Sequence, residues 1–300
     1  MVEIHDIVKS YPRAGIEALK NITFDVEKGE LFGLIGPDGA GKSSLFRILT
    51  TLLLPDAGKA IVNGMDVVQD FKKIRKEVGY MPGRFSLYQD LSVEENLRFF
   101  ATVFGTTIEE NYHLIRDIYQ QIEPFKKRRA GKLSGGMKQK LALCCALIHR
   151  PTVLFLDEPT TGVDVVSRKE FWEMLKNLQK MGITILVSTP YMDEATLCDR
   201  IALIQSGNIL SINTPSGTID SYPETLFAAK AENMSGLLRD LRNQSEVNFT
   251  YSFGDEHHLI LNNVEAIDTL KNKLSSSGHG SVKFNEIPPT IEDCFINLMR

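Results

Sequence analysis

Short apolar runs alternate with amphipathic stretches along the first 220 residues of the chain. Four of these runs are rich in leucine and β-branched residues, as buried strands are, and they cover residues 31–35, 152–156, 183–187 and 201–204. Helical periodicity over 166–180 and 191–197 separates the last three runs. Strands that alternate with helices form parallel sheets, so the pattern predicts an α/β core.

The regions on either side of the first apolar run have a different pattern. Residues 2–8 and 21–27 are predicted strands, and Asn63-Gly64 after the apolar residues 60–62 predicts a hairpin turn.

The region from about residue 85 to residue 150 is mainly helical in pattern. A capping box formed by Ser92 and Glu95 predicts a helix over 92–105, and periodicity predicts further helices over 108–122 and 136–150.

The pattern changes again beyond residue 220. It predicts a strand, a helix, two strands, a helix, a strand and a last helix, over residues 226–231, 233–243, 246–253, 257–261, 264–275, 282–284 and 290–299. The order β-α-β-β-α-β predicts a small split βαβ domain.

Composition is that of a globular protein, with 300 residues, 43% of them hydrophobic and 24% charged. The net charge of −4 gives no strong attraction to nucleic acid or anionic lipid, so no nucleic-acid partner is expected. Four cysteines fit a reducing compartment. The longest apolar run, 141–148, is shorter than the ~20 residues that span a bilayer, and the N-terminus lacks a signal peptide, so a cytoplasmic location is predicted.

A glycine-rich segment, GPDGAGKS, follows the run at 31–35 and precedes a helix predicted over 43–54. It fits G-x-x-x-x-G-K-[ST], in which glycines let backbone N–H groups face phosphate oxygens. Lys42 supplies a positive charge for the β- and γ-phosphates, and Ser43 supplies a hydroxyl for Mg²⁺. The candidate nucleotide-binding residues of this segment are Gly36, Pro37, Asp38, Gly39, Ala40, Gly41, Lys42, Ser43 and Ser44.

Two carboxylates follow the apolar run at 152–156. Asp157, at the end of the predicted strand, is the second candidate Mg²⁺ ligand beside Ser43. Glu158 is the candidate catalytic residue, because a carboxylate there can orient or deprotonate a water molecule. Together with the glycine-rich segment, these residues predict a P-loop NTPase that uses ATP and Mg²⁺.

A third motif narrows this assignment. The segment LSGGM, comprising Leu133, Ser134, Gly135, Gly136 and Met137, resembles the signature motif of ATP-binding cassette (ABC) proteins. It lies between the other two motifs, in that family's order. Serine and glycine open a helix here, and a helix N-terminus binds anions. In the family this motif closes over the ATP of the opposite subunit, so the resemblance implies a second ABC ATPase chain, in a homodimer or a heterodimer.

The resemblance also implies a fold and a domain organisation. Residues 1–220 resemble an ATP-binding cassette, which implies an α/β fold with a RecA-like P-loop NTPase core, an antiparallel β subdomain and an inserted α-helical subdomain at about 85–150. Tyr11 resembles the aromatic residue that stacks on adenine, and Asp164 lies in a loop like the one through which subunits communicate. Residues 221–300 resemble the α+β C-terminal extension of ABC-2-type exporter ATPases.

The resemblance also implies a membrane partner. The resemblance implies that ATP-driven dimer closure energises an exporter through an integral membrane permease subunit, with the chain peripheral at the inner face of the cell membrane. The expected docking surface comprises residues 83–88 and the helix over 92–105.

Two positions depart from the family pattern. Where the family has a histidine that contacts the γ-phosphate, this chain has Pro190, and where it has a glutamine near Mg²⁺ and water, this chain has Gly83. Thr189 as N-cap and Pro190 at the first helical position would suit a helix start. Losing one hydrogen-bond donor to a transition state costs about 10²–10³ in rate, so MgATP binding should persist while hydrolysis is slow.

Two alternative functions remain open from the sequence. The first is a degenerate, mainly regulatory ABC subunit that pairs with a catalytically complete cassette, which Gly83 and Pro190 favour. The second is a soluble ABC ATPase without a transport role. Ribosomal members usually carry two cassettes and DNA-repair members carry long coiled coils, and neither pattern occurs in this sequence.

Overall fold

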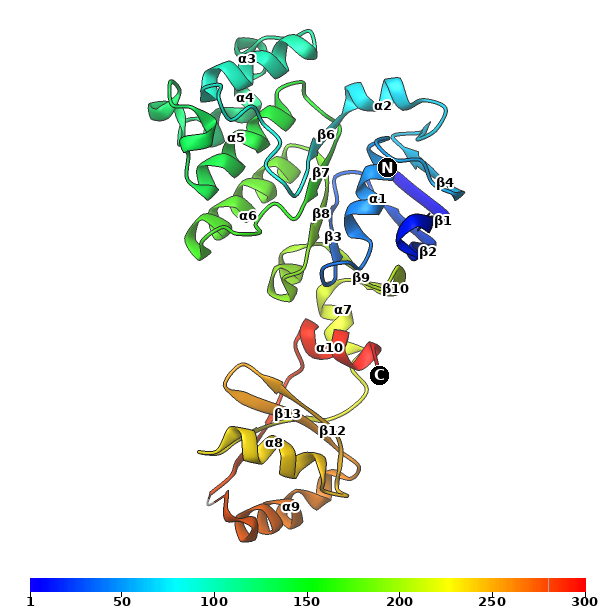
Figure 1. Ribbon diagram of the computed structural model, residues 1–300, viewed down its shortest axis with the longest axis vertical. Coiled ribbons are helices and arrows are strands. Elements are labelled where there is room, and N and C mark those ends of the chain that lie inside the picture. The colour runs from blue at the N-terminus through cyan, green and yellow to red at the C-terminus, as the bar shows by residue number, and fades with distance from the viewer. Residues whose placement is uncertain (280) are drawn as a thin grey trace. The chain divides into compact units, whose positions relative to one another are not determined.

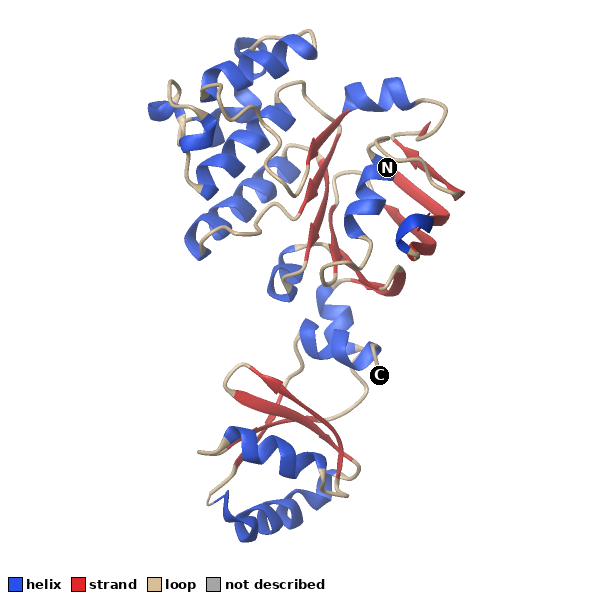
Figure 2. Ribbon diagram, in the orientation of Figure 1, coloured by secondary structure: helices blue, strands red, loops and turns tan. Residues whose placement is uncertain are grey.

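The computed structural model describes residues 1–279 and 281–300, and the chain divides into two compact units, Met1–Thr218 (unit 1) and Ile219–Arg300 (unit 2). Within these described ranges no helix is long and apolar enough to cross a membrane. Unit 1 combines an antiparallel sheet, a mainly parallel sheet and a group of helices, as Figures 1 and 2 show.

The antiparallel sheet of unit 1 has the strand order β2-β1-β4-β5. Asn63 and Gly64 join its last two strands with φ angles of 51° and 74°, which confirms the predicted hairpin turn. Both predicted N-terminal strands are present, although the first continues to Tyr11 and the second already begins at Ile16, earlier than expected. The bounds are β1 (Val2–Tyr11), β2 (Ile16–Val26), β4 (Ala57–Val62) and β5 (Met65–Asp66).

The central sheet of unit 1 has the strand order β10-β9-β3-β8-β7-β6. Neighbours from β9 to β6 are parallel, which confirms the α/β core, and β10 pairs antiparallel with β9. The four apolar runs are β3, β7, β8 and β9, whereas the short β6 and the half-polar β10 escape the pattern. The bounds are β3 (Leu31–Ile35), β6 (Val78–Met81), β7 (Val153–Asp157), β8 (Thr184–Thr189), β9 (Arg200–Gln205) and β10 (Asn208–Asn213).

Helices cover both faces of the central sheet (Figure 1). On one face, Phe46 of α1 meets Phe155 of β7 edge to face, with 5.8 Å between the ring centroids. Because side chains alternate along a strand, Leu154 and Leu156 point to the other face, which α5 and α6 cover. The bounds are α1 (Lys42–Leu49), α2 (Phe71–Glu77), α5 (Gly135–Leu147), α6 (Val165–Lys180), the 3₁₀ helix η4 (Met192–Leu197) and α7 (Pro215–Asp220).

A helical region lies between β6 and β7 in the sequence. It contains α3 (Val93–Val103), α4 (Ile108–Tyr119), α5 and two 3₁₀ turns, η2 (Glu123–Phe125) and η3 (Ala130–Lys132). The predicted capping box is confirmed, because Ser92 N donates to Glu95 Oε2 at 2.7 Å and Glu95 N donates to Ser92 Oγ at 3.2 Å. These helices place the segment LSGGM at the start of α5.

Unit 2 has one antiparallel sheet in the order β12-β13-β11-β14, with α8 and α9 packed against one face. The element order confirms the predicted β-α-β-β-α-β pattern. The last helix, α10, is tied to the sheet by a hydrogen bond of 2.6 Å between Asp293 and His258. The bounds are β11 (Leu226–Lys230), α8 (Met234–Arg242), β12 (Val247–Phe253), β13 (Glu256–Leu261), η5 (Val264–Ala266), α9 (Ile267–Leu274), η6 (Ser275–His279), β14 (Lys283–Ile287) and α10 (Ile291–Leu298).

Candidate nucleotide site

The glycine-rich loop runs from the end of β3 to the start of α1. Gly41 precedes the helix with a φ of 110°, and a Cβ there would lie 2.3 Å from the carbonyl oxygen of Ala18, so only glycine fits. No side chain caps α1, which leaves the positive helix terminus facing the loop. Along the loop Gly36 and Ala40 are buried, Pro37 is half-buried, and Asp38 and Gly39 are exposed.

Lys42 turns its ammonium group back into this loop and is only 3% exposed. Its Nζ donates to the carbonyl oxygens of Gly36 at 2.7 Å and Pro37 at 3.0 Å, and it lies 3.1 Å from Oε1 of Glu158. The structure therefore brings together the lysine of the first motif and the glutamate of the second.

Asp157 and Glu158 are held by Ser188 on the neighbouring strand β8. Ser188 Oγ donates to Asp157 Oδ1 at 2.6 Å, and the amide of Glu158 donates to both Ser188 O and Ser188 Oγ at 3.0 Å. This role of Ser188 is not predicted from the motifs of the sequence. The feature that could have indicated it is the polar pair Ser188-Thr189, which ends an otherwise apolar run.

Glu158 has a strained backbone, with a φ of 49°. Residues other than glycine rarely adopt this left-handed conformation, which costs of order 1–3 kcal/mol and persists only where the surroundings enforce it. Here the two hydrogen bonds from Glu158 N to Ser188 enforce it. The strain turns the chain sharply after β7, with the Glu158 carboxylate beside Lys42.

A polar cavity of about 420 Å³ lies against these residues. Two of its lining residues, Arg47 and Arg84, are cations that the sequence analysis does not single out. Arg47 follows Ser43 by one helical turn on α1, a spacing that places both on one face. The cavity is lined by Ser43, Arg47, Pro82, Gly83, Arg84, Asp157 and Glu158.

Gly83 lies directly against the carboxylate pair. A Cβ at this position would lie 3.1 Å from the carbonyl oxygen of Asp157 and 3.8 Å from Cβ of Glu158. A longer side chain at position 83 would therefore enter the same cavity, after a shift of a few tenths of an ångström.

The expected helix start at Pro190 is wrong. Thr189 is the last residue of β8 and pairs with Ile35, and the following helix is a 3₁₀ helix that begins at Met192 with Tyr191 as its N-cap. Thr189 Oγ1 accepts a hydrogen bond of 3.1 Å from the amide of Tyr191, the residue before the helix, and donates to Glu194 Oε2 at 2.5 Å, and no side chain caps the helix itself. Asp193 and Glu194 do lie in the first turn, as expected.

Pro190 nevertheless lies beside the glycine-rich loop. The preceding carbonyl, Thr189 O, accepts a hydrogen bond of 3.2 Å from the amide of Gly36. Glu194 fixes the chain that follows, because this buried carboxylate also accepts from Thr160 Oγ1 at 2.7 Å, and Arg168 Nε lies 3.6 Å away. The sequence analysis does not predict this buried role of Glu194.

Tyr11 lies at the end of β1, and its hydroxyl forms a hydrogen bond of 3.1 Å with Ser44 Oγ. The aromatic ring therefore lies next to the first turn of α1, although β1 and α1 are far apart in the sequence.

The signature segment forms a separate group. Leu133 is buried, Ser134 and Gly135 are exposed, and Met137 is half-buried, with its amide 3.4 Å from the capping hydroxyl Ser134 Oγ. A Cβ on Gly136 would lie 2.7 Å from Ser167 Oγ, so α5 approaches the start of α6 closely.

Asp164 caps that same helix, α6, and is exposed. Its Oδ1 accepts a hydrogen bond of 3.0 Å from Ser167 N, which together with the Ser167 side chain lowers the pKa of Asp164. The structure therefore brings Asp164 and the signature segment together. It does not bring them to the glycine-rich loop, because α1 and α5 cover opposite faces of the sheet (Figure 1).

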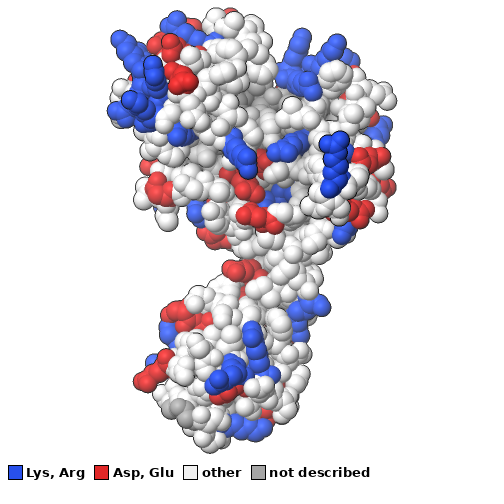
Figure 3. Space-filling model, viewed as in Figure 1, with Lys and Arg blue, Asp and Glu red and all other residues white. Residues whose placement is uncertain are grey.

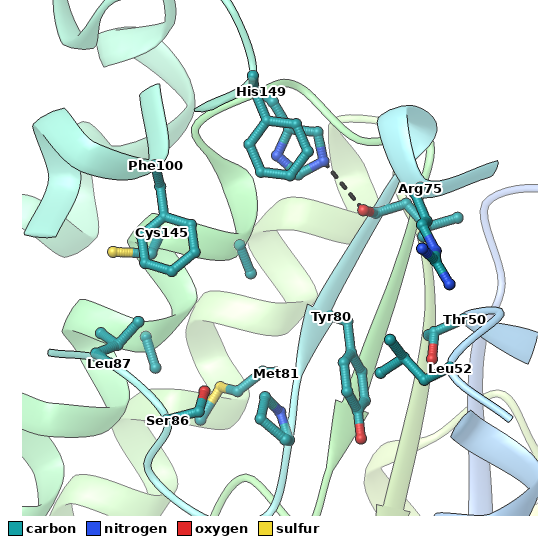
Figure 4. A pocket seen from close by; sticks show the side chains of 15 residues that line it. Thr50, Leu52, Arg75, Tyr80, Met81, Ser86, Leu87, Phe100, Cys145 and His149 are labelled. Atoms are coloured by element: carbon teal, nitrogen blue, oxygen red, sulfur yellow. Dashed lines mark hydrogen bonds between the residues drawn. The ribbon is translucent and has the colours of Figure 1, made fainter. Parts of the chain in front are cut away.

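A second, mainly apolar cavity of about 260 Å³ lies between the helical region and β6 (Figure 4). His149 and Phe104 stack on its wall with 3.8 Å between ring centroids, and His149 Nε2 donates to Val78 O at 3.0 Å. Burial lowers the pKa of His149, so the ring is neutral at pH 7. Burial also raises the pKa of Tyr80, on the opposite wall, to about 12, with the charge of Asp157 adding to the shift.

Comparisons with known proteins agree on one family. Residues 19–161 match the family model described as ABC transporter. The chain is 33% identical, over 93% of its own length and 91% of the relative's, to the Nod factor export ATP-binding protein I of Rhizobium sp. (strain N33). It is 41% identical to the probable multidrug ABC transporter ATP-binding protein YbhF of Escherichia coli (strain K12), over 72% of this chain but only 37% of YbhF.

Solved structures give the same assignment. A dimeric ATP-binding cassette in a post-hydrolysis state, bound to ADP and Pi, matches 71% of this chain and 98% of its own, with a TM-score of 0.65 and 25% identity. An ATP-binding subunit of an ABC transporter matches 74% of this chain and 93% of its own, with a TM-score of 0.67 and 27% identity. Fold, site geometry and relatives thus converge, and the chain belongs to the ATP-binding proteins of ABC transporters.

Proposed function

We propose that this chain binds MgATP in the cavity beside Lys42, hydrolyses it slowly, and thereby energises a membrane exporter. The observation that carries the proposal is the 3.1 Å contact between Lys42 Nζ and Glu158 Oε1, in a cavity wall that also contains Ser43 and Asp157. A phosphate-binding cation and a carboxylate for water activation are thus already in one place.

Each residue has a distinct role in this proposal. Lys42 and the N-terminal end of α1 bind the β- and γ-phosphates, and Tyr11 stacks on the adenine. Glu158 orients or deprotonates the attacking water, and phosphate that engages Lys42 frees this carboxylate from its ion pair. Pro190 offers no hydrogen-bond donor to the γ-phosphate, which is why turnover is slow.

The donor set fits Mg²⁺. The hydroxyl of Ser43 and the carboxylate of Asp157 line the same cavity, and hard oxygen donors are what this ion binds. Ser43 and Asp157 would hold it together with ATP, and the ion would neutralise charge on the phosphates. Ser188 contributes by fixing the orientation of the Asp157 carboxylate.

A second cassette chain completes the proposal. Ser134, Gly135 and Asp164 are exposed on one side of the chain, and the neighbouring Val165 and Val166 are 78% and 69% exposed. Exposed large apolar side chains beside an exposed helix N-terminus fit an interface that is buried against another subunit. We propose a head-to-tail dimer in which each signature segment meets the other chain's nucleotide, either as a homodimer or with a different cassette.

The permease partner is proposed to dock at the cavity of Figure 4. Leu87 and Ser86 of the expected docking segment and Phe100 of α3 line it, so an apolar segment of a permease would bury their side chains. Relatives named for Nod factor export and multidrug transport support an exporter as the partner. We propose that the chain lies at the inner face of the cell membrane, held there by the permease. We propose residues 1–220 as the nucleotide-binding domain and 221–300 as its C-terminal extension.

One alternative has a specific observation in its favour. Gly83 and Pro190 both lack the hydrogen-bonding side chains that the family uses next to the γ-phosphate, so a mainly regulatory subunit beside a complete cassette remains the second candidate. The soluble ABC ATPase has no comparable support.

Calorimetric titration with MgATP and a steady-state ATPase assay test the main proposal. Wild type should bind MgATP, Lys42→Ala should abolish binding, and Lys59→Ala, at an exposed lysine on β4, should not change it. Glu158→Gln should remove turnover but keep binding. Binding that survives Lys42→Ala would reject the nucleotide site, whereas turnover too low to respond to Glu158→Gln would favour the regulatory alternative.

A further inference from the structure

We propose that one edge of unit 1 binds the surface of a membrane that contains anionic lipids. This "α2 edge" comprises Leu52, Leu54, Val68, Phe71, Lys72 and Lys76. The proposal goes beyond the proposed function, because it gives this chain its own contact with lipid in addition to its contact with a permease. The net charge of −4 gives no reason to expect such a contact, and the local distribution of charge does.

The outer face of α2 is cationic. Ile74 is fully buried, and Lys72 and Lys76, one turn apart, lie on the side of the helix away from it. Lys73 is neutralised by Asp70 at 2.8 Å. Across the described ranges of the chain no carboxylate lies within ion-pair distance of Lys72 or Lys76, and Lys72 Nζ lies 5.9 Å from the ring centroid of Phe71 in the same edge. Neither charge is therefore paired with a carboxylate. Figure 3 shows blue side chains gathered over α2 at the upper right.

Large apolar side chains are exposed on α2 and on the two loops next to it. Leu54 is 63% and Leu52 57% exposed, and Val68 and Phe71 are exposed as well. Single exposed apolar residues are common on any surface, but four of them around one basic helix form a patch of the kind that marks an interaction site.

The loop that carries Leu52 and Leu54 is held in place by hydrogen bonds. Arg75 donates from Nε to Thr51 Oγ1 at 2.8 Å and from Nη2 to Thr51 O at 2.7 Å, which ties the loop to α2. The amides of Leu52 and Leu53 both donate to Arg47 O, at 2.7 and 3.0 Å. The backbone of this loop is therefore fixed in the arrangement that leaves Leu52 exposed.

The charge and apolar character of the α2 edge indicate a lipid surface as its partner. Cations interleaved with large apolar side chains match the headgroup region of a bilayer, where anionic lipids attract lysines and shallow apolar contacts bury leucine. Leu52 and Arg75 also line the cavity proposed for the permease, so the α2 edge is continuous with that interface. A chain docked there presents the edge to the inner leaflet.

Flotation of the purified full-length chain with vesicles tests the proposal. We expect binding to vesicles of phosphatidylcholine mixed with phosphatidylglycerol, little binding to phosphatidylcholine alone, and weakening as salt rises. Each juxtamembrane lysine contributes about fivefold in affinity, so Lys72→Gln with Lys76→Gln should weaken partitioning about 25-fold. Leu52→Ser with Leu54→Ser should weaken it independently of salt.

The matched control is Lys169→Gln with Lys180→Gln, which makes the same change in net charge at exposed positions of α6. It should leave partitioning unchanged, and all variants should keep the MgATP affinity of wild type, which separates this test from that of the nucleotide site. Absence of binding to the anionic vesicles, or an equal loss in the control, overturns the proposal. If the double variant at Lys72 and Lys76 instead loses only co-purification with a permease, the edge binds protein and not lipid.

Discussion

The ammonium group of Lys42 lies 3.1 Å from Oε1 of Glu158, so the cation expected to hold phosphate and the carboxylate expected to act on water form one ion pair. Lys42 is 3% exposed, and its remaining hydrogen bonds go to carbonyl oxygens of its own loop. A bound phosphate must therefore compete with Glu158 for Lys42. This competition links nucleotide binding to the position of the Glu158 carboxylate.

Replacing Glu158 by glutamine should tighten MgATP binding while it abolishes hydrolysis. The neutral amide no longer competes for the Lys42 ammonium group, and a hydrogen bond to a charged group is worth about 1.5–3 kcal/mol, so an affinity gain of about tenfold, the low end of that range, is expected. Calorimetry gives the affinity and phosphate release gives the rate. Weaker binding by Glu158→Gln would show that the ion pair supports the loop instead of competing with phosphate.

Pro190→His should raise kcat with little change in ATP affinity. The strand end at Thr189 is hydrogen-bonded to Gly36, so a histidine there lies beside the phosphate loop. The gain is bounded by about 10²–10³ for one donor to the transition state. Pro190→Ala is the control, because it removes the ring without adding a donor. A faster Pro190→Ala enzyme would mean that the ring itself, and not the missing donor, limits turnover.

Adding Gly83→Gln to Pro190→His should raise kcat further, because Cβ at position 83 points at the Asp157–Glu158 turn. The gain should be smaller than additive, since that Cβ lies 3.1 Å from Asp157 O and the loop must shift slightly to accept it. The same phosphate-release assay measures it. A double variant slower than Pro190→His would place the cost of the shift above the benefit of the amide.

Ser188→Ala should raise the Mg²⁺ concentration needed for half-maximal turnover. Ser188 Oγ orients Asp157 at 2.6 Å, and a lost hydrogen bond to a charged group corresponds to about tenfold in an equilibrium constant. Ser188→Thr keeps the hydroxyl and should largely restore the wild-type Mg²⁺ dependence. An equal fall in kcat for both variants at saturating Mg²⁺ would indicate a packing defect and not a role through Asp157.

Glu158→Gln with MgATP should convert the monomer to a dimer, and Ser134→Arg in addition should prevent this. Ser134 is exposed at the start of α5, where a bulky cation would block the other chain's nucleotide. Light scattering coupled to gel filtration measures the mass, and Lys180→Arg serves as a surface control. A dimer that forms despite Ser134→Arg would move the interface elsewhere, and a monomer throughout would point to a heterodimer.

Unit 2 should lose stability as pH rises above about 6.5, the ordinary pKa of histidine. Burial lowers the pKa of His258, but Asp293 and Glu256 outweigh it, so the folded pKa is raised and the folded state binds more protons in this window. The slope is at most about 1.4 kcal/mol per pH unit. Stability stops falling once pH exceeds the raised pKa.

At acid pH the stability of unit 2 changes in the opposite direction and falls as pH falls. Burial raises the pKa of Asp293, but hydrogen bonds from His258, Thr290 and Tyr251 outweigh it, so the folded pKa is lowered and this stabilisation disappears as pH falls through it. Hydrogen exchange of the α10 segment, measured in the full chain as a function of pH, reports the stability of unit 2 on the alkaline limb above pH 6.5 and on the acid limb. His258→Gln should flatten the alkaline limb and His113→Gln, on the exposed face of α4, should not. An unchanged limb in His258→Gln would assign the pH dependence to another group.

The sequence by itself determined the strands that are apolar throughout, and the hairpin and caps that depend on neighbouring residues. Leu31–Ile35 and Val153–Asp157 follow from their own side chains, because a strand buried on both faces must be continuously apolar. The contact between the glycine-rich loop and the Asp157–Glu158 pair follows as well, since parallel strands bring their carboxyl ends to one edge of the sheet.

Only the tertiary structure decided what depends on contacts between distant segments. Thr189 is suited to cap a helix by its own chemistry, but its backbone is paired with β3, and its hydroxyl accepts from Tyr191 N and donates to Glu194, so the helix begins later. The strained φ of Glu158 exists because Ser188, on another strand, holds its amide. The local sequence pattern indicates which hydrogen bonds a residue can make with its neighbours in the chain. The later helix start and the strained φ of Glu158 depend instead on hydrogen-bond partners from distant segments, which only the folded sheet brings within reach.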